Sequence, residues 1–333
     1  MTPDDRELSR RAFHARAALL AGLGLTAPRR GLAQGSGKTA KPGPTGVGAP
    51  LGTRRVFSPA DPWNTPVASA PVDRNSARIL RRLGLNKPLH PDFGTVYNGA
   101  PNGIPYVVVP GNQPKVPVTF TYADESDPGP YPIPPDAPIE GGPNGEGDRH
   151  VLVVDRDNWK LYELFNARKN PDGNGWSASS GAVFDLTTNT FRPAGWTSAD
   201  AAGLPIFPGL VRYEEVVSHG VVRHAFRFTV VKTRRAYVAP ARHFASRDTG
   251  DDLLPMGARV RLKASYDVRR FPPQARVILQ TLQNYGMLVA DNGGDWFLGG
   301  APDPRWDDEQ LATLKNVKVA DFEVVRMGPL FTR

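Results

Sequence analysis

Acidic, basic and imidazole groups stand among apolar residues in the segment 147–167, GDRHVLVVDRDNWKLYELFNA. The apolar residues flank a polar turn, which predicts a β-hairpin. With residues 155–158 as a four-residue turn, His150 lies opposite Glu163, and their Cβ atoms are expected about 5 Å apart. A carboxyl group on such an apolar face has a raised pKa and can act as a general acid. The hairpin is therefore a candidate part of an active site.

Two alternatives weaken this interpretation of the hairpin. A two-residue turn at Asp157 and Asn158 would place His150 opposite Phe165 instead of Glu163. A buried His–Glu pair can also be a purely structural contact at a sheet edge, where each group satisfies the other. The hairpin alone does not decide between chemistry and folding.

Further polar residues at the ends of apolar segments favour a lined cleft. His224 lies inside the apolar stretch 221–232, and Asp291 with Asn292 ends the apolar stretch 287–290. One such residue is unremarkable, but several strands that end in acid, amide or imidazole groups indicate a site between strands. The other members of this set are Glu214, Glu215, Arg242 and His243.

Aromatic residues near the turns could stack on sugar rings, because one face of a pyranose is apolar. Trp296 and Trp306 are the expected substrate contacts among them. The alternative is that these rings fill the core, and for many of them we expect that. The remaining candidates are Trp159, Trp176, Trp196, Tyr131 and Tyr162.

Gly and Pro each occur 34 times in 333 residues, a composition typical of strands, turns and loops rather than long helices. The sequence therefore predicts an all-β domain with a few short helices, arranged as a β-sandwich over residues 54–333. Expected strands are 103–111, 115–127, 181–189, 221–232, 258–264 and 287–300, the last with a turn; expected helices are 73–85, 272–286 and 307–317.

The first 53 residues predict export. Arg10 and Arg11 precede a short apolar stretch, 17–27, and Ala33 ends a run of small residues that suits a signal peptidase. Residues 1–33 resemble a twin-arginine signal peptide, and the Gly/Pro-rich residues 34–53 resemble a linker. We expect a periplasmic or extracellular protein that uses the twin-arginine export machinery. No stable membrane insertion is expected, because the apolar stretch is too short to span a bilayer.

The composition argues against several classes of protein. The chain has no cysteine, so disulfides, thiol nucleophiles and zinc–thiolate sites are excluded. Its net charge of +8 comes without a basic run interleaved with aromatic residues, and no nucleic-acid partner is expected. No cofactor or catalytic metal is expected either. A structural calcium ion is a weak alternative, because the acidic turns at 155–158, 172–175 and 291–295 do not complete a calcium loop.

Four stretches resemble a widespread family of exported bacterial proteins of unassigned function: 147–167, 195–216, HAFRF at 224–228, and 284–306. The resemblance covers roughly residues 55–325. It implies a sandwich of the lectin and glucanase kind, which is a concanavalin-like jelly roll, but it supplies no catalytic residues. Residues that also match a broader set of secreted proteins are Gly203, Arg212, Glu215, His224, Tyr285, Gly286 and Asp291.

The leading functional interpretation is a secreted glycoside hydrolase that cleaves a polysaccharide. Such an enzyme needs one protonated and one ionised carboxyl group, and Glu163 and Asp291 are the expected pair. His150 and His224 would tune their pKa values or bind sugar hydroxyls.

Two other functions remain open. A polysaccharide lyase acting on a uronate-containing glycan could use His224 with Tyr285, supported by Arg212 and Asn292. A non-catalytic glycan-binding or cell-envelope protein would use the aromatic platforms and keep the polar pairs for structure.

Overall fold

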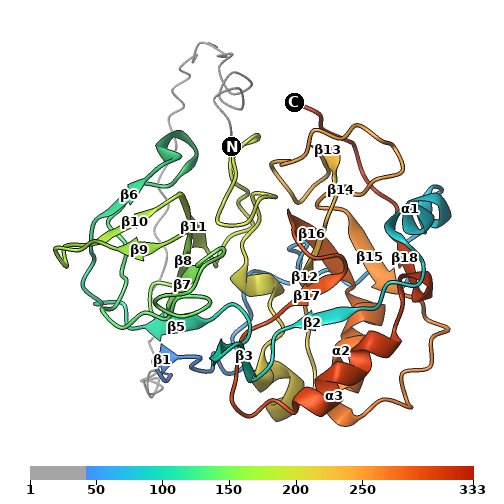
Figure 1. Ribbon diagram of the computed structural model, residues 1–333, viewed down its shortest axis with the longest axis horizontal. Helices are drawn as coiled ribbons and strands as arrows, with labels where there is room; N and C mark the ends of the chain where they lie inside the picture. The colour runs from blue at the N-terminus through green and yellow to red at the C-terminus, as the bar shows by residue number, and fades with distance from the viewer. Residues whose placement is uncertain (1–42) are drawn as a thin grey trace, which may run out of the picture. The chain divides into compact units, whose positions relative to one another are not determined.

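Two mixed β-sheets form the body of the protein in the computed structural model, which describes residues 43–333 (Figure 1). The predicted signal peptide, and the linker as far as residue 42, lie outside the described residues. The first sheet has the strand order β1-β5-β7-β8-β11, in which only β5 and β7 run parallel. Its strands are β1 (Gly46–Val47), β5 (Tyr106–Val109), β7 (Val151–Asp155), β8 (Lys160–Phe165) and β11 (Ser180–Asp185).

The second sheet has the order β18-β15-β16-β12-β17-β2 and is built mostly from the later half of the chain. Strand β2 is the exception, because it comes early in the sequence and pairs in parallel with β17 at the sheet edge. The strands are β2 (His90–Asp92), β12 (Phe226–Val230), β15 (Arg259–Leu262), β16 (Met287–Asn292), β17 (Phe297–Gly299) and β18 (Phe322–Val324).

Smaller elements cover these sheets. A three-stranded sheet of β6 (Val118–Phe120), β10 (Trp176–Ala178) and β9 (Arg168–Lys169) packs on the first sheet through a separate apolar cluster. The helices are α1 (Ser76–Leu83), α2 (Pro273–Asn284) and α3 (Asp308–Ala312), with a π-helical turn at Glu214–Ser218. Two short ribbons are β3 (Val96–Tyr97) with β4 (Ala100–Pro101), and β13 (Arg234–Tyr237) with β14 (Pro255–Met256).

The larger apolar cluster joins both sheets, which explains why they behave as one body. Leu152, Val154 and Leu161 of the first sheet share it with Phe228 and Val289 of the second. Residues 43–333 accordingly form one compact unit. No helix in this part of the chain has the length and apolar character that a bilayer span requires.

The strand-rich class is confirmed, with 25% of residues in strands and 15% in helices. The finer expectation of a jelly roll is not met, because a jelly roll is antiparallel, whereas β5–β7, β12–β16 and β17–β2 are parallel pairs. Parallel neighbours need long crossover connections, and single-strand patterns do not reveal them.

The predicted linker ends earlier than expected. Gly46 and Val47 pair with β5, Ala49 is buried, and the Glu214 carboxylate accepts hydrogen bonds from the N–H groups of Leu51 and Gly52. The folded unit therefore begins at Gly43, eleven residues before the predicted start at Arg54.

The hairpin forms, but in the alternative register. Leu152 pairs with Glu163, which places His150 beside Phe165, with ring centroids 5.8 Å apart. The four loop residues are 156–159 rather than 155–158. Asp155 ends strand β7 and accepts hydrogen bonds from Asn158, while Trp159 has a left-handed backbone (φ 52°) that cannot continue a strand. Leu152 lies directly opposite Glu163, so these two side chains share a face of the sheet. His150 is two residues before Leu152 and therefore faces the same side.

Candidate functional site

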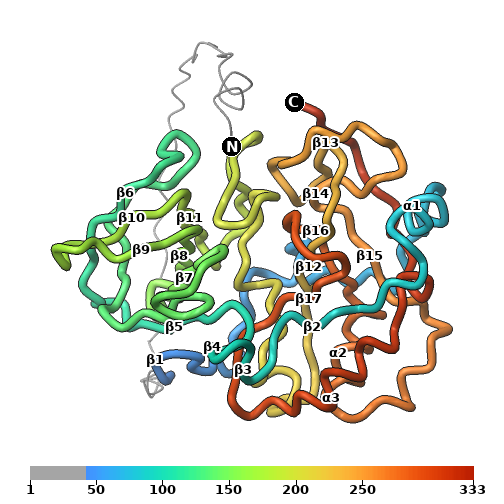
Figure 2. The backbone as a smooth tube through the Cα atoms, viewed as in Figure 1, coloured from blue at the N-terminus to red at the C-terminus, as the bar shows by residue number. Residues whose placement is uncertain are grey.

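The site is organised by residues 199–207, which we call the central segment. This stretch runs between the strands of the first sheet and those of the second, as the yellow part of the tube in Figure 2 shows. Side chains from both sheets bond to its backbone or its side chains. Residues 199–206 belong to no helix or strand, so these side-chain hydrogen bonds hold the segment in position.

From the first sheet, Glu163 bonds to the end of the central segment. Its carboxylate is fully buried and accepts hydrogen bonds of 2.9–3.0 Å from the N–H groups of Ile206 and Phe207. Burial raises the pKa of Glu163 to about 7 in spite of these donors. Because this carboxyl group has no contact with solvent, it cannot reach a substrate. Glu163 is a positioning residue, which corrects its expected catalytic role.

His150 joins the central segment to the loop before strand β7. Its Nδ1 lies 2.6 Å from Oε2 of Glu140, and its Nε2 lies 3.1 Å from the carbonyl oxygen of Ala199. Both partners are acceptors, so both ring nitrogens must carry a proton and the ring is an imidazolium. Burial would lower the pKa of His150, but the Glu140 carboxylate outweighs it and raises the pKa to about 9.

Glu140 is the ionised member of this pair. Burial alone would raise its pKa, but the charge and hydrogen bonds of His150 hold the pKa below the usual value. Its side chain is 25% exposed, so it reaches solvent. Both of its bonds to His150 use Oε2, and within residues 43–333 no hydrogen bond involves Oε1. That oxygen can accept a proton from water or contact a substrate.

From the second sheet, Arg227 and Asp291 meet Asp200 of the central segment. Arg227 donates two hydrogen bonds, of 2.8 and 2.7 Å, to the two carboxylate oxygens of Asp200. Both side chains of this ion pair are buried, so removal of either one would leave an uncompensated charge in the core. Gly299 makes room for it, because a Cβ there would lie 2.9 Å from the Arg227 guanidinium.

Asp291 completes this group as a protonated acid. Arg227 forms a buried ion pair with the Asp200 carboxylate, and the charge of that carboxylate acts on Asp291. Burial, with the charge of Asp200 added, raises the pKa of Asp291 to about 8. Asp291 is partly exposed and also accepts a 3.4 Å hydrogen bond from the Ala201 N–H.

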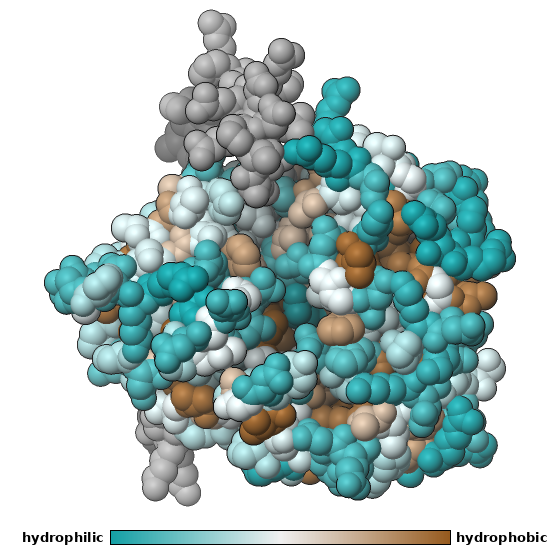
Figure 3. Space-filling view, viewed as in Figure 1, coloured by the Kyte–Doolittle hydropathy of each residue, from teal (hydrophilic) through white to brown (hydrophobic). Residues whose placement is uncertain are grey.

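These groups form one electrostatic cluster centred on Arg227. The charge of the guanidinium acts on Asp200, Asp291 and Glu140. Burial, and then the charge of Glu140, raise the pKa of Asp92, and the charge of Arg227 partly offsets this rise. Asp92 lies in β2, the edge strand, and is exposed. The space-filling view is hollowed near the middle of this face, between the regions over β8 and β17 (Figure 3). We call Asp92, Glu140, His150, Asp200, Arg227 and Asp291 the carboxylate cluster.

His224 does not belong to the carboxylate cluster. It bonds through Nε2 to Glu215 at 3.0 Å and through Nδ1 to the carbonyl oxygen of Ala225, and Arg212 bonds to the same Glu215 oxygen at 2.7 Å. His224 precedes the start of β12, whereas Asp291 pairs with Thr229 near its end. His224 lies two residues before β12 begins, and the strand extends about 10 Å from Phe226 to Thr229.

Tyr285 is also far from Asp291. It follows the last residue of α2, before β16 begins at Met287, whereas Asp291 lies near the other end of β16, about 13 Å beyond Met287. Asn292 is close to Asp291, but its amide is used to hold neighbouring loops through Thr233 and Ala245. The expected group of Arg212, His224 and Tyr285 with Asn292 is therefore split between the two ends of the second sheet.

The aromatic platforms are absent from the exposed surface of the described residues at the two expected positions. Trp296 and Trp306 are 1% and 4% exposed, and both pack in the core against phenylalanine rings. Of the tryptophans in this part of the chain, only Trp196 is partly exposed. Core filling is the observed role, as the alternative interpretation proposed.

Comparisons with known proteins give no further identification. The chain matches no protein-family model, no curated protein and no solved structure. Within residues 43–333, no group of three or more His, Asp or Glu side chains has the geometry to hold a metal ion.

Glu140, Asp92 and the Asp200–Arg227 pair were not expected from the sequence. Glu140 lies within a loop rich in proline and glycine, and Asp200 lies in an irregular segment, so neither interrupts a periodic pattern. A signal was present for two of them, because Asp200 and Arg227 lie inside the stretches 195–216 and 224–228 that carry the family resemblance.

Proposed function

We propose that this protein is a glycoside hydrolase that cleaves a polysaccharide with Asp291 as general acid and Glu140 as general base or nucleophile. What carries the proposal is the placement of these two carboxyl groups around a single guanidinium, that of Arg227, with neighbours that raise the pKa of Asp291 and lower that of Glu140. Two carboxyl groups held in opposite protonation states are what glycoside hydrolysis requires.

Each role follows from the neighbours of the carboxyl group. Asp291 keeps a proton at neutral pH because burial, and then the charge of Asp200, raise its pKa to about 8, and the proton can pass to a glycosidic oxygen. Glu140 stays ionised because the His150 imidazolium lies beside it, and Oε1 is free to activate water or attack the sugar. Asp92 is a third carboxyl group at this site and could bind sugar hydroxyls.

The proposal also includes export, with the polysaccharide outside the cytoplasm. It rests on Arg10, Arg11 and the following apolar stretch, and on the resemblance to exported bacterial proteins. The twin-arginine export machinery is the proposed partner, and the periplasm or the extracellular space is the proposed location.

The two alternative functions have less support. A lyase built on His224 and Tyr285 would need them beside Asn292, and the strand lengths separate them. A non-catalytic glycan-binding protein would need exposed rings, and Trp296 and Trp306 are buried. A protonated Asp291 lowers the stability of the fold at neutral pH, and glycan binding alone does not require a group with that cost.

The test is a reducing-sugar assay of the full chain against a panel of neutral and uronate-containing polysaccharides. Asp291→Asn and Glu140→Gln should each lower turnover by about 100-fold or more. Asp124→Asn and Glu146→Gln remove exposed carboxylates and should match the wild type. Turnover that survives in both site variants would overturn the proposal. Release of an ultraviolet-absorbing unsaturated product would assign a lyase instead.

A further inference from the structure

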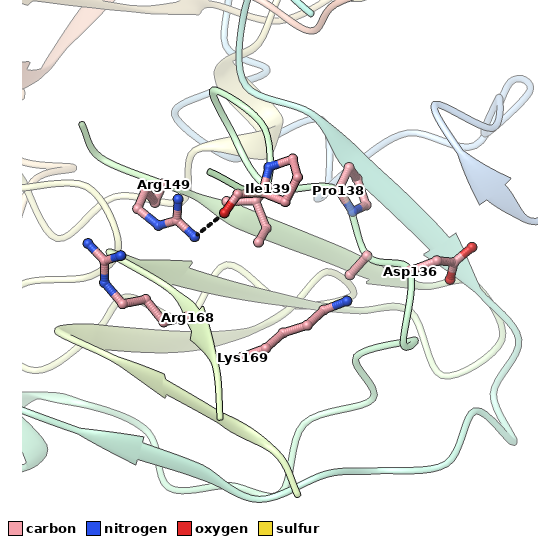
Figure 4. A pocket seen from close by; sticks show the side chains of 8 residues that line it. Asp136, Pro138, Ile139, Arg149, Arg168 and Lys169 are labelled. Atoms are coloured by element: carbon pink, nitrogen blue, oxygen red, sulfur yellow. Dashed lines mark hydrogen bonds between the residues drawn. The ribbon is translucent and has the colours of Figure 1, made fainter. Parts of the chain in front are cut away.

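A second site lies on the opposite side of the first sheet from the carboxylate cluster. A cavity of about 510 Å³ opens between the proline-rich loop and strand β9, lined by Arg149, Arg168, Lys169, Asp136 and the apolar residues Ala137, Pro138, Ile139 and Pro143. Figure 4 shows the three cationic side chains directed toward it from two elements, with the Asp136 carboxylate pointing away. The volume is within the range of about 300–1,000 Å³ that small-molecule sites occupy.

Arg149 is the buried part of this cavity. Its side chain is 4% exposed, and its backbone is left-handed (φ 49°), which an arginine adopts only where surrounding contacts hold it. The guanidinium donates to the carbonyl oxygens of Ala167 at 3.1 Å, of Pro143 at 3.2 Å and of Gly145. These bonds use one N–H on each nitrogen, so two N–H groups of the five remain.

The positive charge of the cavity is not neutralised by the protein. Within residues 43–333, none of Arg149, Arg168 and Lys169 forms an ion pair with a carboxylate. Burial lowers the pKa of Arg149, and the nearby charge of Arg168 lowers it further, so the two guanidinium groups repel each other. A buried arginine with no anionic partner costs free energy unless a ligand supplies the anion.

We propose that this cavity binds an anionic sugar residue, whose carboxylate is held by Arg149, Arg168 and Lys169. A planar carboxylate matches the fork of a guanidinium, and the apolar rings of Pro138 and Pro143 with Ile139 can contact the apolar face of a sugar. That the ligand is a sugar rests on the proposed function; that it is an organic anion rests on the cavity alone.

The position of the cavity makes it a separate binding site on the same enzyme. Arg149 and Ile139 directly adjoin His150 and Glu140 in sequence, and Glu140 donates its N–H to the carbonyl oxygen of His150 at 3.0 Å. Ile139 packs with the apolar cluster on the Val151 and Val153 face of β7, whereas the carboxylate cluster lies on the Leu152 face, so this backbone contact joins the two sites across the first sheet. A polysaccharide held at the cavity would keep the enzyme on its substrate.

The test is calorimetric titration of the full chain with hexagalacturonate, with neutral cellohexaose and with inorganic phosphate. We expect binding of hexagalacturonate that weakens with salt, and no binding of cellohexaose at the cavity. The double variant Arg168→Ala/Lys169→Ala should weaken hexagalacturonate binding about tenfold or more. The exposed adjacent pair in Arg269→Ala/Arg270→Ala is the matched control and should leave it unchanged.

Equal affinity for the neutral and acidic hexamers, or undiminished binding by the Arg168/Lys169 variant, would overturn the inference. Binding of phosphate without hexagalacturonate would also overturn it and would assign the cavity to a tetrahedral anion. Turnover of neutral polysaccharides is measured in parallel on the same preparation. Hydrolysis without hexagalacturonate binding would support the proposed function and overturn the cavity inference. Hexagalacturonate binding without any hydrolysis would support the cavity inference and overturn the proposed function.

Discussion

Asp200 and Asp291 share one guanidinium: both oxygens of Asp200 accept hydrogen bonds from Arg227, and the charge of Arg227 also acts on Asp291. Burial, and then the charge of Asp200, raise the pKa of Asp291 to about 8. The two aspartates differ in exposure as well, because Asp200 is fully buried and Asp291 is partly exposed. The same chemical group thus has a structural role at one position and can act on a ligand at the other.

The two aspartates should respond differently to substitution by asparagine. Asp291→Asn replaces a protonated acid by an amide of the same shape and removes the free-energy cost of keeping that acid protonated, so the free energy of unfolding at pH 7 should rise while turnover is lost. Asp200→Asn leaves the buried Arg227 charge without its partner and should cost about 3–5 kcal/mol. Urea unfolding of both variants beside the wild type measures the difference. A large destabilisation by Asp291→Asn would show that its carboxyl group is ionised.

Glu163→Gln should destabilise the protein without touching the substrate site. Glutamine offers one acceptor oxygen and one NH2 group, so an NH2 would face the N–H donors of Ile206 and Phe207. At about pH 4.5, where the raised pKa of Glu163 costs little stability, the loss should be about 1–3 kcal/mol in the free energy of unfolding. Thermal melts and turnover, measured together, check it. If Glu163→Gln melts like the wild type and loses turnover, its assignment as a positioning residue is wrong.

The protein should lose stability as the pH rises from about 4 to 9. Glu163, Asp291 and His150 have folded-state pKa values of about 7, 8 and 9, each above its ordinary value. The folded state therefore binds more protons than the unfolded state across this window, and each contribution is complete below the ordinary pKa and is lost as the pH rises through the raised one.

Glu163 accounts for a separable part of this pH dependence, about 3 kcal/mol between pH 4.5 and 7. Unfolding free energies measured across the pH range should show a shallower decline in Glu163→Gln, and the exposed-site variant Glu146→Gln should follow the wild type. A wild-type stability that rises from pH 5 to pH 8 would contradict the raised pKa values.

His224 should prove structural. Its two ring nitrogens bond to Glu215 and to the Ala225 carbonyl oxygen, and it lies far from Asp291 along β12. His224→Ala should lower the free energy of unfolding by about 1–3 kcal/mol and leave the turnover number within about twofold. Steady-state kinetics below the melting temperature separates the two effects. A large loss of turnover at unchanged stability would restore the catalytic role.

On the proposed export route the twin-arginine machinery reads Arg10 and Arg11, so their replacement by lysine should retain unprocessed protein in the cytoplasm. Cell fractionation followed by immunoblotting measures the distribution. Replacement of Arg29 and Arg30 by lysine is a matched control, since it changes the same residue types nearby. Equal export of the Arg10/Arg11 variant and the control would remove the basis for this export route.

The parts of the fold that depend on local pattern could be predicted from the sequence. The helix expected over 272–286 is α2, which begins after Pro272 and ends before Gly286, and the strand expected from residue 287 is β16. The hairpin forms, but its register depends on how Asp155 and Trp159 close the turn. Side-chain capping and a left-handed tryptophan leave no periodic signal.

The site depends on long-range contacts that no local pattern contains. His150 and Asp291 were expected in it and are there, but Glu140, Asp200 and Arg227 were not expected. Glu140 and His150 at the first sheet meet Arg227 and Asp291 of the second sheet only because the central segment lies between the sheets. That segment has neither helical nor strand periodicity. His224 and Glu163 look the same as His150 and Asp291 in sequence. The two histidines differ in the partners that the fold gives them, and the two acids differ in exposure.

Strand β2 carries Asp92 but pairs with β17, which lies about two hundred residues later in the chain. Ribosomes add roughly 5–20 residues per second, so β2 is without its partner strand β17 for roughly 10–40 s of synthesis. Throughout that interval the amino-terminal segment has already left the ribosome. A cell that makes this protein must keep the nascent chain from aggregating before the final strands emerge, which makes the order of synthesis a constraint on its production.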